Sequence, residues 1–177
     1  SGEAAQKESG LAVRLLEDFL RSGMESVAAL RTVNSALSLK NEETGAFTTV
    51  DLLRIDLYTG TGELCKLGAA PTYLRRKGAV SRMSGAALPA GLAEGEGEPD
   101  VTQLELREGD CVLLVSDGIA DGTEDGWLRE LMTQFDGESP KELARLVMEE
   151  SEKRVGAADD RTAVVITLKK RPEGRGE

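Results

Sequence analysis

The chain has 177 residues, a formal net charge of −10 and no histidine. This length suffices for one domain with a hydrophobic core and is short for two, and the negative charge argues against a nucleic-acid partner held by phosphate contacts. The lack of histidine excludes Ser-His-Asp and Cys-His nucleophilic systems and histidine-rich zinc sites. An enzyme of this composition therefore depends on carboxylates with a metal ion and water, or on lysine and arginine.

The N-terminal half is predicted to form two helices followed by hairpin-connected strands. Apolar residues recur at helical spacing in Glu3–Arg21 and again from Ser26 to about Lys40, and a polar connector follows at Asn41–Gly45. Alternating apolar runs separated by glycine-containing turns then predict strands. The predicted strands are Phe47–Tyr58, Glu63–Leu67, Tyr73–Arg76, Ala79–Met83 and Val101–Leu106.

The C-terminal half adds a buried strand, two helices and a last strand. The unbroken apolar run Cys111–Val115 is typical of a strand buried on both faces of a sheet. Helices are predicted over Trp127–Phe135 and from Ser139-Pro140 to about Gly156, before the strand Thr162–Leu168. This order of elements predicts an α+β fold with antiparallel sheet and outer helices.

Residues 1–168 are predicted to form one folded domain, and the charged tail 169–177 is predicted to be disordered. No apolar run approaches the roughly 18 residues that a membrane-spanning helix needs. A cytoplasmic domain is therefore expected, in which Cys65 and Cys111 are buried, reduced thiols. Arg75, Arg76 and Lys77 could contact a phosphate, but a solvated hairpin tip is the favoured expectation.

Two acidic sequences stand at the ends of buried strands. Ser116-Asp117-Gly118 follows the strand Cys111–Val115, and Asp159-Asp160 precedes the last strand. A carboxylate at the tip of a buried strand is costly to desolvate unless a cation or hydrogen-bond donors receive it. Each sequence alone is more often an ordinary turn. Together, two strands with carboxylates at one end could hold a hard divalent cation through oxygen ligands.

The residues around Asp117 narrow the chemistry. A haloacid-dehalogenase-type phosphatase needs a second aspartate two residues after the nucleophilic one, and Ile119 occupies that position. No glycine-rich run ends in the Gly-Lys-Ser/Thr of a P-loop, and no general base accompanies Ser116. A metal-bound water that attacks a phosphoester remains, because it needs only clustered carboxylates. Arg161 could bind phosphate or form an ion pair with Asp160.

These sequences, in this order, resemble motifs of the PPM (PP2C-like) serine/threonine phosphatases, and are most similar to the bacterial SpoIIE branch. The matching segments are Phe47-Thr48-Thr49-Val50, Leu67-Gly68-Ala69-Ala70-Pro71, Leu88-Pro89-Ala90-Gly91-Leu92, Leu113-Leu114-Val115-Ser116-Asp117-Gly118-Ile119 and Asp159-Asp160-Arg161-Thr162. The resemblance extends from Ser1 to about Leu168. It implies a PP2C-like α-β-β-α sandwich of mainly antiparallel sheets with flanking helices.

The resemblance also implies which residues carry the chemistry. Asp117 and Asp159 are expected as catalytic metal ligands, and Gly118 and Asp160 as further residues of the metal site. The expected cofactor is Mn²⁺ or Mg²⁺ in a two-metal centre, where a metal-activated water hydrolyses phosphoserine or phosphothreonine. The expected partner is a small regulatory phosphoprotein such as an anti-sigma-factor antagonist, in bacterial sporulation or sigma-factor regulation.

The start of the chain departs from this family's pattern. The family carries a bridging aspartate in an Asp-Gly-Met-Gly-Ser-Gly segment, of which Ser1-Gly2 resembles only the end. We therefore expect an N-terminally truncated domain of a multidomain or membrane-anchored parent, with weak metal binding and little or no turnover. A homodimer is expected through the N-terminal helices, which resemble a regulatory switch segment, or through an exposed sheet edge. The alternative function is a pseudophosphatase that binds its partner without catalysis.

Overall fold

The computed structural model describes residues 3–45, 47–92, 97–120, 123–137, 139–155 and 159–170. The helices are α1 (Glu3–Arg21), α2 (Ser26–Thr44), α3 (Gly126–Gln134) and α4 (Pro140–Val155). The strands are β1 (Val50–Ile55), β2 (Thr61–Leu67), β3 (Thr72–Arg76), β4 (Ala79–Met83), β5 (Asp100–Glu105), β6 (Cys111–Val115) and β7 (Ala163–Thr167). This order is the one predicted from the sequence. Three expectations concern residues outside the described ones: the motif end at Ser1-Gly2, the helix end at Gly156 and the tail from Arg171.

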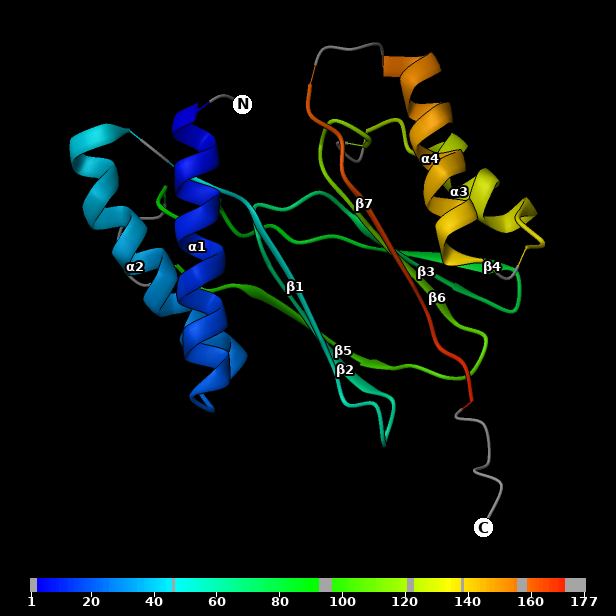
Figure 1. Cartoon of the computed structure of the whole chain (residues 1–177), viewed down its shortest axis with the longest axis horizontal. Coiled ribbons are helices and arrows are strands. Elements are labelled where there is room, and N and C mark those ends of the chain that lie inside the picture. Colours follow the sequence, from blue (N-terminus) through cyan, green and yellow to red (C-terminus); the bar gives the residue numbers. More distant parts are fainter. Residues whose placement is uncertain are drawn as a thin grey trace.

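The strands form two antiparallel sheets with helices on their outer faces. One sheet has the order β1-β2-β5 and the other the order β4-β3-β6-β7. Figure 1 shows α1 and α2 beside the first sheet, and α3 and α4 on the opposite side of the molecule, beside the second. The predicted α+β fold, an α-β-β-α sandwich, is confirmed. Among the described helices, none is both long and apolar enough to span a membrane.

Two hydrophobic clusters fasten the helices to the sheets. The cluster under α1 and α2 contains Ala12, Leu16, Ala29, Leu30, Val33, Leu37, Cys65, Leu67 and Ala90. The cluster under α3 and α4 contains Tyr73, Cys111, Leu113, Val115, Ile119, Ala120, Leu128, Met132, Leu143 and Val147. Burying a large apolar side chain of this kind stabilises the fold by about 1.5–3 kcal/mol. The expected burial of both cysteines as free thiols is confirmed.

Strand β6 is buried on both faces, as its apolar run predicts. Leu113 packs in the cluster under α3 and α4, whereas its neighbour Val112 points to the opposite face because side chains alternate along a strand. Both side chains are fully buried. Val112 therefore lies in the layer between the two sheets. Strand β6 thus contributes buried side chains to both faces of the second sheet, the one under the helices and the one toward the first sheet.

Two elements end elsewhere than the sequence predicts. Helix α2 continues to Thr44, through the residues expected as a connector, and is followed by Gly45 with a positive φ of 67°. Strand β1 is shorter than expected because Asp56 starts a turn. Its carboxylate accepts the backbone N–H groups of Tyr58 and Thr59 at 2.8 and 3.1 Å, which ends the extended conformation.

An ion pair between the buried Asp110 and the partly exposed Arg76 fixes one end of the second sheet. Asp110, just before β6, has a side chain only 2% exposed, and its two oxygens accept Arg76 Nε at 2.9 Å and Nη2 at 2.6 Å. Oδ2 also accepts the backbone N–H of Arg107 at 2.8 Å. Arg75 is half-buried and donates to a backbone carbonyl of α3. The expected solvated hairpin tip is therefore wrong for Arg75 and Arg76 and holds for Lys77, which is exposed.

We expect the Asp110 pair to make stability depend on acid pH. Burial alone would raise the pKa of Asp110, but the hydrogen bonds from Arg76 and the Arg107 backbone outweigh it and lower that pKa below its ordinary value. The stabilisation is therefore present above about pH 3.9 and is lost as pH falls through the folded-state pKa. Asp110→Asn should lower the free energy of unfolding by about 2 kcal/mol near neutral pH.

Urea denaturation at a series of pH values measures this effect. The difference between the wild type and Asp110→Asn should shrink as the pH is lowered below about 4. Asp18→Asn, on the exposed face of α1, is the matched control and should leave stability within about 0.5 kcal/mol at every pH. A wild-type advantage that stays constant down to the lowest pH would contradict this role for Asp110.

Candidate active site

The antiparallel pairing of β6 with β7 places the end of one strand beside the start of the other. The pairing continues past both strands, because the Ser116 N–H donates to the Thr162 carbonyl at 3.0 Å and the Thr162 N–H donates to Ser116 Oγ at 2.9 Å. Ser116 Oγ also donates to the Asp160 carbonyl at 3.3 Å. The segments that carry Asp117 and Asp159 therefore lie side by side.

Gly118 allows the two segments to touch. It is buried, and a Cβ atom at this position would lie only 2.4 Å from the carbonyl oxygen of Asp160. The same Cβ would lie 3.3 Å from Cγ of Arg161. Any residue larger than glycine would therefore push the Asp117 segment away from the Asp160 segment.

The acidic side chains at this junction are exposed to solvent. Asp117 Oδ1 accepts the N–H of Gly118 at 3.0 Å, and Asp159 Oδ1 accepts the N–H of Asp160 at 2.8 Å. Each bond uses one carboxylate oxygen and is local, so both carboxylates remain accessible to a ligand. Within the described residues Arg161 forms no ion pair with Asp160, and its Nη1 atom is buried without a hydrogen-bond partner.

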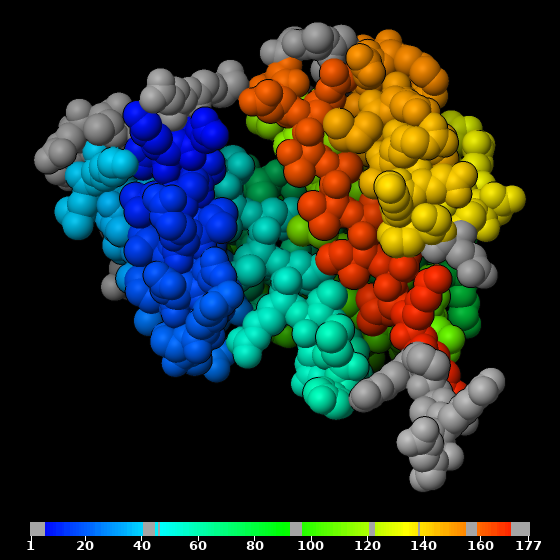
Figure 2. Space-filling model, viewed as in Figure 1, coloured from blue at the N-terminus to red at the C-terminus, as the bar shows by residue number. Residues whose placement is uncertain are grey.

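A cavity of about 250 Å³ opens beside Asp117, between the ends of the two sheets. Residues from β1, the turn after β2, the end of β6 and the start of β7 line it, among them Thr49, Asp51, Gly68, Ser116, Asp117 and Thr162. Asp51 and Asp117 therefore reach the same cavity from different sheets. Figure 2 shows the hollow between α1 and β7 in which β1 is visible.

Asp51 belongs to a buried polar cluster that crosses from one sheet to the other. Its Oδ2 atom accepts Lys66 Nζ of β2 and Thr72 Oγ1 of β3, each at 2.8 Å. Lys66 Nζ also donates to the Ala70 carbonyl at 2.6 Å. The Lys66 side chain is 3% exposed, and this burial lowers its pKa, although the Asp51 carboxylate opposes the shift. Oδ1 of Asp51 is buried without a hydrogen-bond partner.

The donors around the cavity suit a hard divalent cation, although the described residues alone do not complete a metal site. Asp117 and the unpartnered Oδ1 of Asp51 are carboxylate oxygens, the ligand type that Mn²⁺ and Mg²⁺ take. Among the described residues, however, no three acidic, cysteine or histidine side chains gather closely enough to hold a metal. Mg²⁺ is commonly held by one or two carboxylates with waters and substrate phosphates. Asp117 lines the cavity and Asp159 lies on the adjoining segment, so a metal centre here would need further oxygen donors.

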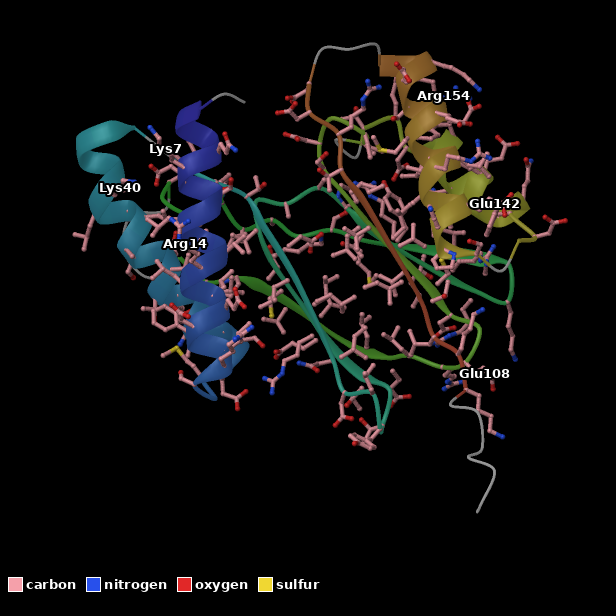
Figure 3. All side chains as sticks on the ribbon, in the orientation of Figure 1. Lys7, Arg14, Lys40, Glu108, Glu142 and Arg154 are labelled. Atoms are coloured by element: carbon pink, nitrogen blue, oxygen red, sulfur yellow. The ribbon has the colours of Figure 1, made fainter. Side chains whose placement is uncertain are left out.

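Two other cavities involve the N-terminal helices. One of about 410 Å³ is lined by Lys7, Arg14 and Lys40, which Figure 3 shows on α1 and α2, away from α4. Another of about 420 Å³ lies between α1 and β1 and shares Thr49 and Asp51 with the acidic cavity. The first of these is basic and lies away from the acidic segments. The cavity of about 250 Å³ that Asp51 and Asp117 line, called the acidic cavity, is therefore the candidate active site.

The sequence identified one half of this site and missed the other. Asp117 and Gly118 were found because they interrupt an apolar strand, and the structure brings them to the Asp159-Asp160 segment as expected. Asp51 and Lys66 were missed because single charged residues in a strand usually face solvent. One signal was available, since the two charges are opposite in sign and lie directly across from each other in the β1–β2 register.

Comparison with known proteins gives a family match over nearly the whole chain. The family model described as "Stage II sporulation protein E (SpoIIE)" matches residues 1–169. The chain is 31% identical to stage II sporulation protein E of Priestia megaterium over 94% of its own length, and 33% identical to that of Bacillus subtilis over 95%. It spans 29% and 21% of the lengths of these two relatives.

Solved structures match the fold. The PP2C phosphatase domain of SpoIIE from Bacillus subtilis, solved with a fragment of its regulatory domain, has a TM-score of 0.83 and 31% identity, covering 95% of this chain and 51% of that one. The catalytic domain of the serine/threonine protein phosphatase PstP, in complex with 2 manganese ions, has a TM-score of 0.68 and 22% identity, covering 90% of this chain and 79% of that one. The second likeness shows the fold alone.

The close approach at Gly118 gives a direct test of the site geometry. We expect Gly118→Ala to lower the free energy of unfolding by about 1–3 kcal/mol, because the new methyl group collides with the Asp160 carbonyl. It should also weaken Mn²⁺ binding, because the carboxylate segments separate. Urea denaturation and a Mn²⁺ titration measure the two effects.

Gly126→Ala is the matched control. Gly126 is the first residue of α3, and an added Cβ would meet no atom within 4 Å. Alanine is the better helix former, so this variant should be unchanged or more stable by about 0.4–1 kcal/mol. Equal stability and Mn²⁺ binding in both variants would show that the two acidic segments do not depend on their close approach.

Proposed function

The chain belongs to the stage II sporulation protein E family, and on that premise we propose that it is the core of a metal-dependent serine/threonine protein phosphatase of the PP2C type. The observation that carries the proposal is the contact of the Asp117-Gly118 segment with the Asp159-Asp160 segment, at the mouth of a cavity between two sheets. Carboxylates in this position are the groups that a metal-dependent phosphoester hydrolase requires.

The positions of the residues suggest their roles in this proposal. Asp117 and Asp159 are the catalytic metal ligands, because both are exposed carboxylates on the joined segments. Asp160 flanks Asp159, and Gly118 gives the backbone the close approach that the site needs. Mn²⁺ or Mg²⁺ is the cofactor we propose, in a two-metal centre. Bound cations of this type supply an activated water and neutralise charge on the phosphoryl group.

The protein's own residues join the two acidic segments and leave space beside them. Ser116 holds the two acidic segments side by side through three hydrogen bonds. Gly68 and Ala70, in the turn after β2, line the cavity with small residues and leave room for a phosphoryl group. Gly68 has a positive φ of 63°, and an added Cβ would lie 2.5 Å from Pro89, so a larger residue is excluded there.

The substrate we propose is phosphoserine or phosphothreonine on a small regulatory phosphoprotein, such as an anti-sigma-factor antagonist, acting in a bacterial cytoplasm. Support for this comes from the family match and from the carboxylate that lines the cavity, a group suited to metal-dependent attack on a phosphoester. A homodimer through α1 and α2 or through β1 is also proposed. β1 is an edge strand in the described part of its sheet, and edge strands offer unpaired backbone groups to a partner.

A second candidate function is binding of the same phosphoprotein without catalysis. One observation favours it. Among the described residues, no three acidic, cysteine or histidine side chains lie close enough together to hold a metal ion. On this reading the cavity recognises the partner's surface and leaves its phosphate intact. The two functions differ in whether Mn²⁺ produces turnover.

The phosphatase proposal predicts Mn²⁺-dependent release of phosphate from a phosphoserine protein. Because the described carboxylates do not complete a metal site, we expect the 177-residue chain to bind Mn²⁺ weakly and to turn over little. A longer chain that also carries an Asp-Gly-Met-Gly-Ser-Gly segment should be active. Asp117→Asn in the longer chain should lower kcat/KM by more than about 100-fold, since even outer-shell partners of a metal cost 10- to 100-fold.

Asp136→Asn is the matched control for this assay, because Asp136 is exposed and lies outside the acidic cavity. It should retain full activity. If the longer wild-type chain releases no phosphate with either Mn²⁺ or Mg²⁺ but still binds the phosphoprotein, the non-catalytic function replaces the phosphatase. If Asp117→Asn is as active as the wild type, the assignment of the site is wrong.

A further inference from the structure

Two adjacent arginines at the end of β3 use their guanidinium groups differently. Arg76 donates from Nε and Nη2, the two nitrogens on one side of the group, to the carboxylate of Asp110. Arg75 donates only from Nη1, to the backbone carbonyls of Met132 and Phe135 at the end of α3. Among the described residues, Nε and Nη2 of Arg75 have no hydrogen-bond or ion-pair partner. The side with which Arg76 binds a carboxylate is therefore unused in Arg75.

The unused side of Arg75 is oriented by α3 and is open to solvent. Nη1 donates to the Met132 carbonyl at 3.2 Å, and the guanidinium carbon lies 5.4 Å from the centroid of the Phe135 ring. The Arg75 side chain as a whole is half-buried, yet neither Nε nor Nη2 is a buried atom without a partner. Both nitrogens therefore keep accessible surface, on a group that is already held at its other end.

Arg75 lines a cavity of about 400 Å³ at one end of the second sheet. The strand register places Arg75 beside Cys111 of β6 and Cys111 beside Thr167 of β7, and Thr167 also lines the cavity. Gly109 and Leu168 form the next part of the wall, and the Gly109 N–H donates to the Leu168 carbonyl at 2.9 Å. The walls of this cavity are therefore paired backbone segments on three neighbouring strands.

The charges around this cavity are mixed, with an excess of one positive charge among the described lining residues. Arg75, Lys169 and Lys170 are cationic, and Glu108 and Asp136 are acidic. All of these except Arg75 are exposed, so the half-buried guanidinium lies below a rim of both signs. Such a pattern fits one carboxylate at Arg75 with a cationic group beside it at the rim. A phosphate dianion fits less well, because Glu108 and Asp136 repel its second charge.

We propose that this cavity is a docking site for an acidic side chain of a partner protein, whose carboxylate accepts both Nε–H and Nη2–H of Arg75. Guanidinium and carboxylate match in this two-bond geometry, which a lysine cannot reproduce. Lys169 adds a second cationic contact, and Glu108 and Asp136 favour a partner segment with a lysine or arginine next to the acid.

The docking site is separate from the acidic cavity. Arg75 pairs with Cys111 at the start of β6, whereas Asp117 follows the end of that strand. Figure 3 shows Glu108, at the rim of the docking site, beside the C-terminal end of β7 and away from α1. The proposal therefore does not depend on the proposed function, and either can fail without the other.

The experiment titrates the ¹⁵N-labelled 177-residue chain with short blocked peptides and follows the Nε–H signal of Arg75 by nuclear magnetic resonance. The test peptide is acetyl-Lys-Glu-Lys-amide and its matched control is acetyl-Lys-Gln-Lys-amide. The glutamate peptide should shift the signal and bind at least about fivefold more tightly than the control. The control is the more positive peptide, so nonspecific attraction to a chain of net charge −10 works against this result.

Three variants separate docking from a structural role of Arg75. Arg75→Lys keeps the charge but loses the two-bond geometry, and it should bind the glutamate peptide about tenfold more weakly, as followed by the Gly109 amide signal. Lys169→Gln should bind about threefold more weakly and keep its stability to urea, because Lys169 is exposed. Arg14→Gln removes one exposed positive charge from α1 and should keep the affinity within about twofold.

Four results would overturn the proposal. Equal shifts from the glutamate and glutamine peptides would show that no carboxylate is recognised. Acetate that binds as tightly as the glutamate peptide would show a site for free carboxylates, and inorganic phosphate that binds more tightly would show a phosphate site. If Arg75→Lys loses stability to urea but binds the glutamate peptide as the wild type does, Arg75 only holds the end of α3. Weaker binding in Arg75→Lys and Lys169→Gln, with wild-type binding in Arg14→Gln, supports the docking site.

Discussion

The antiparallel contact between the end of β6 and the start of β7 is the constraint on which the site depends. Two acidic segments far apart in the chain meet because these strands are neighbours, and Ser116 extends their pairing beyond the sheet. Gly118 carries no side chain, and a Cβ there would collide with the Asp160 carbonyl. Because β6 is buried on both faces, the strand that ends at Asp117 is packed on each side.

The two ends of the sandwich have different polar chemistry. Where β3 ends, Arg76 and Asp110 satisfy each other fully and close the layer between the sheets. Where β6 ends, the Asp51 carboxylate is satisfied on one oxygen only, and a cavity remains between the sheets. This end retains the exposed carboxylate of Asp117 beside a cavity of about 250 Å³.

The sequence predicts the fold well because local patterns decide most of it. The apolar run Cys111–Val115 and the helical stripes of the terminal segments need no tertiary information to be recognised, and the order of elements is as predicted. Asp117 was identifiable because an acid directly after such a run is unusual. The burial of Lys66 was not identifiable, because a single lysine in a strand usually faces solvent. Here the second sheet covers it and leaves it buried. Burial between sheets is a property of the pairing of layers, which periodicity within one strand does not contain.

The exposure of Val164 connects the fold with the function. Val164 of β7 lies directly across from Leu114 of β6, so both side chains point to the same side, toward the first sheet. Val164 is nevertheless 47% exposed, and it lines the acidic cavity. An apolar side chain on the inner face of a sandwich is normally covered, so the described part of the first sheet does not reach under β7. The same gap leaves β1 as an edge strand and admits solvent to Asp117. A group that covers Val164 would therefore also border the cavity that Asp117 lines.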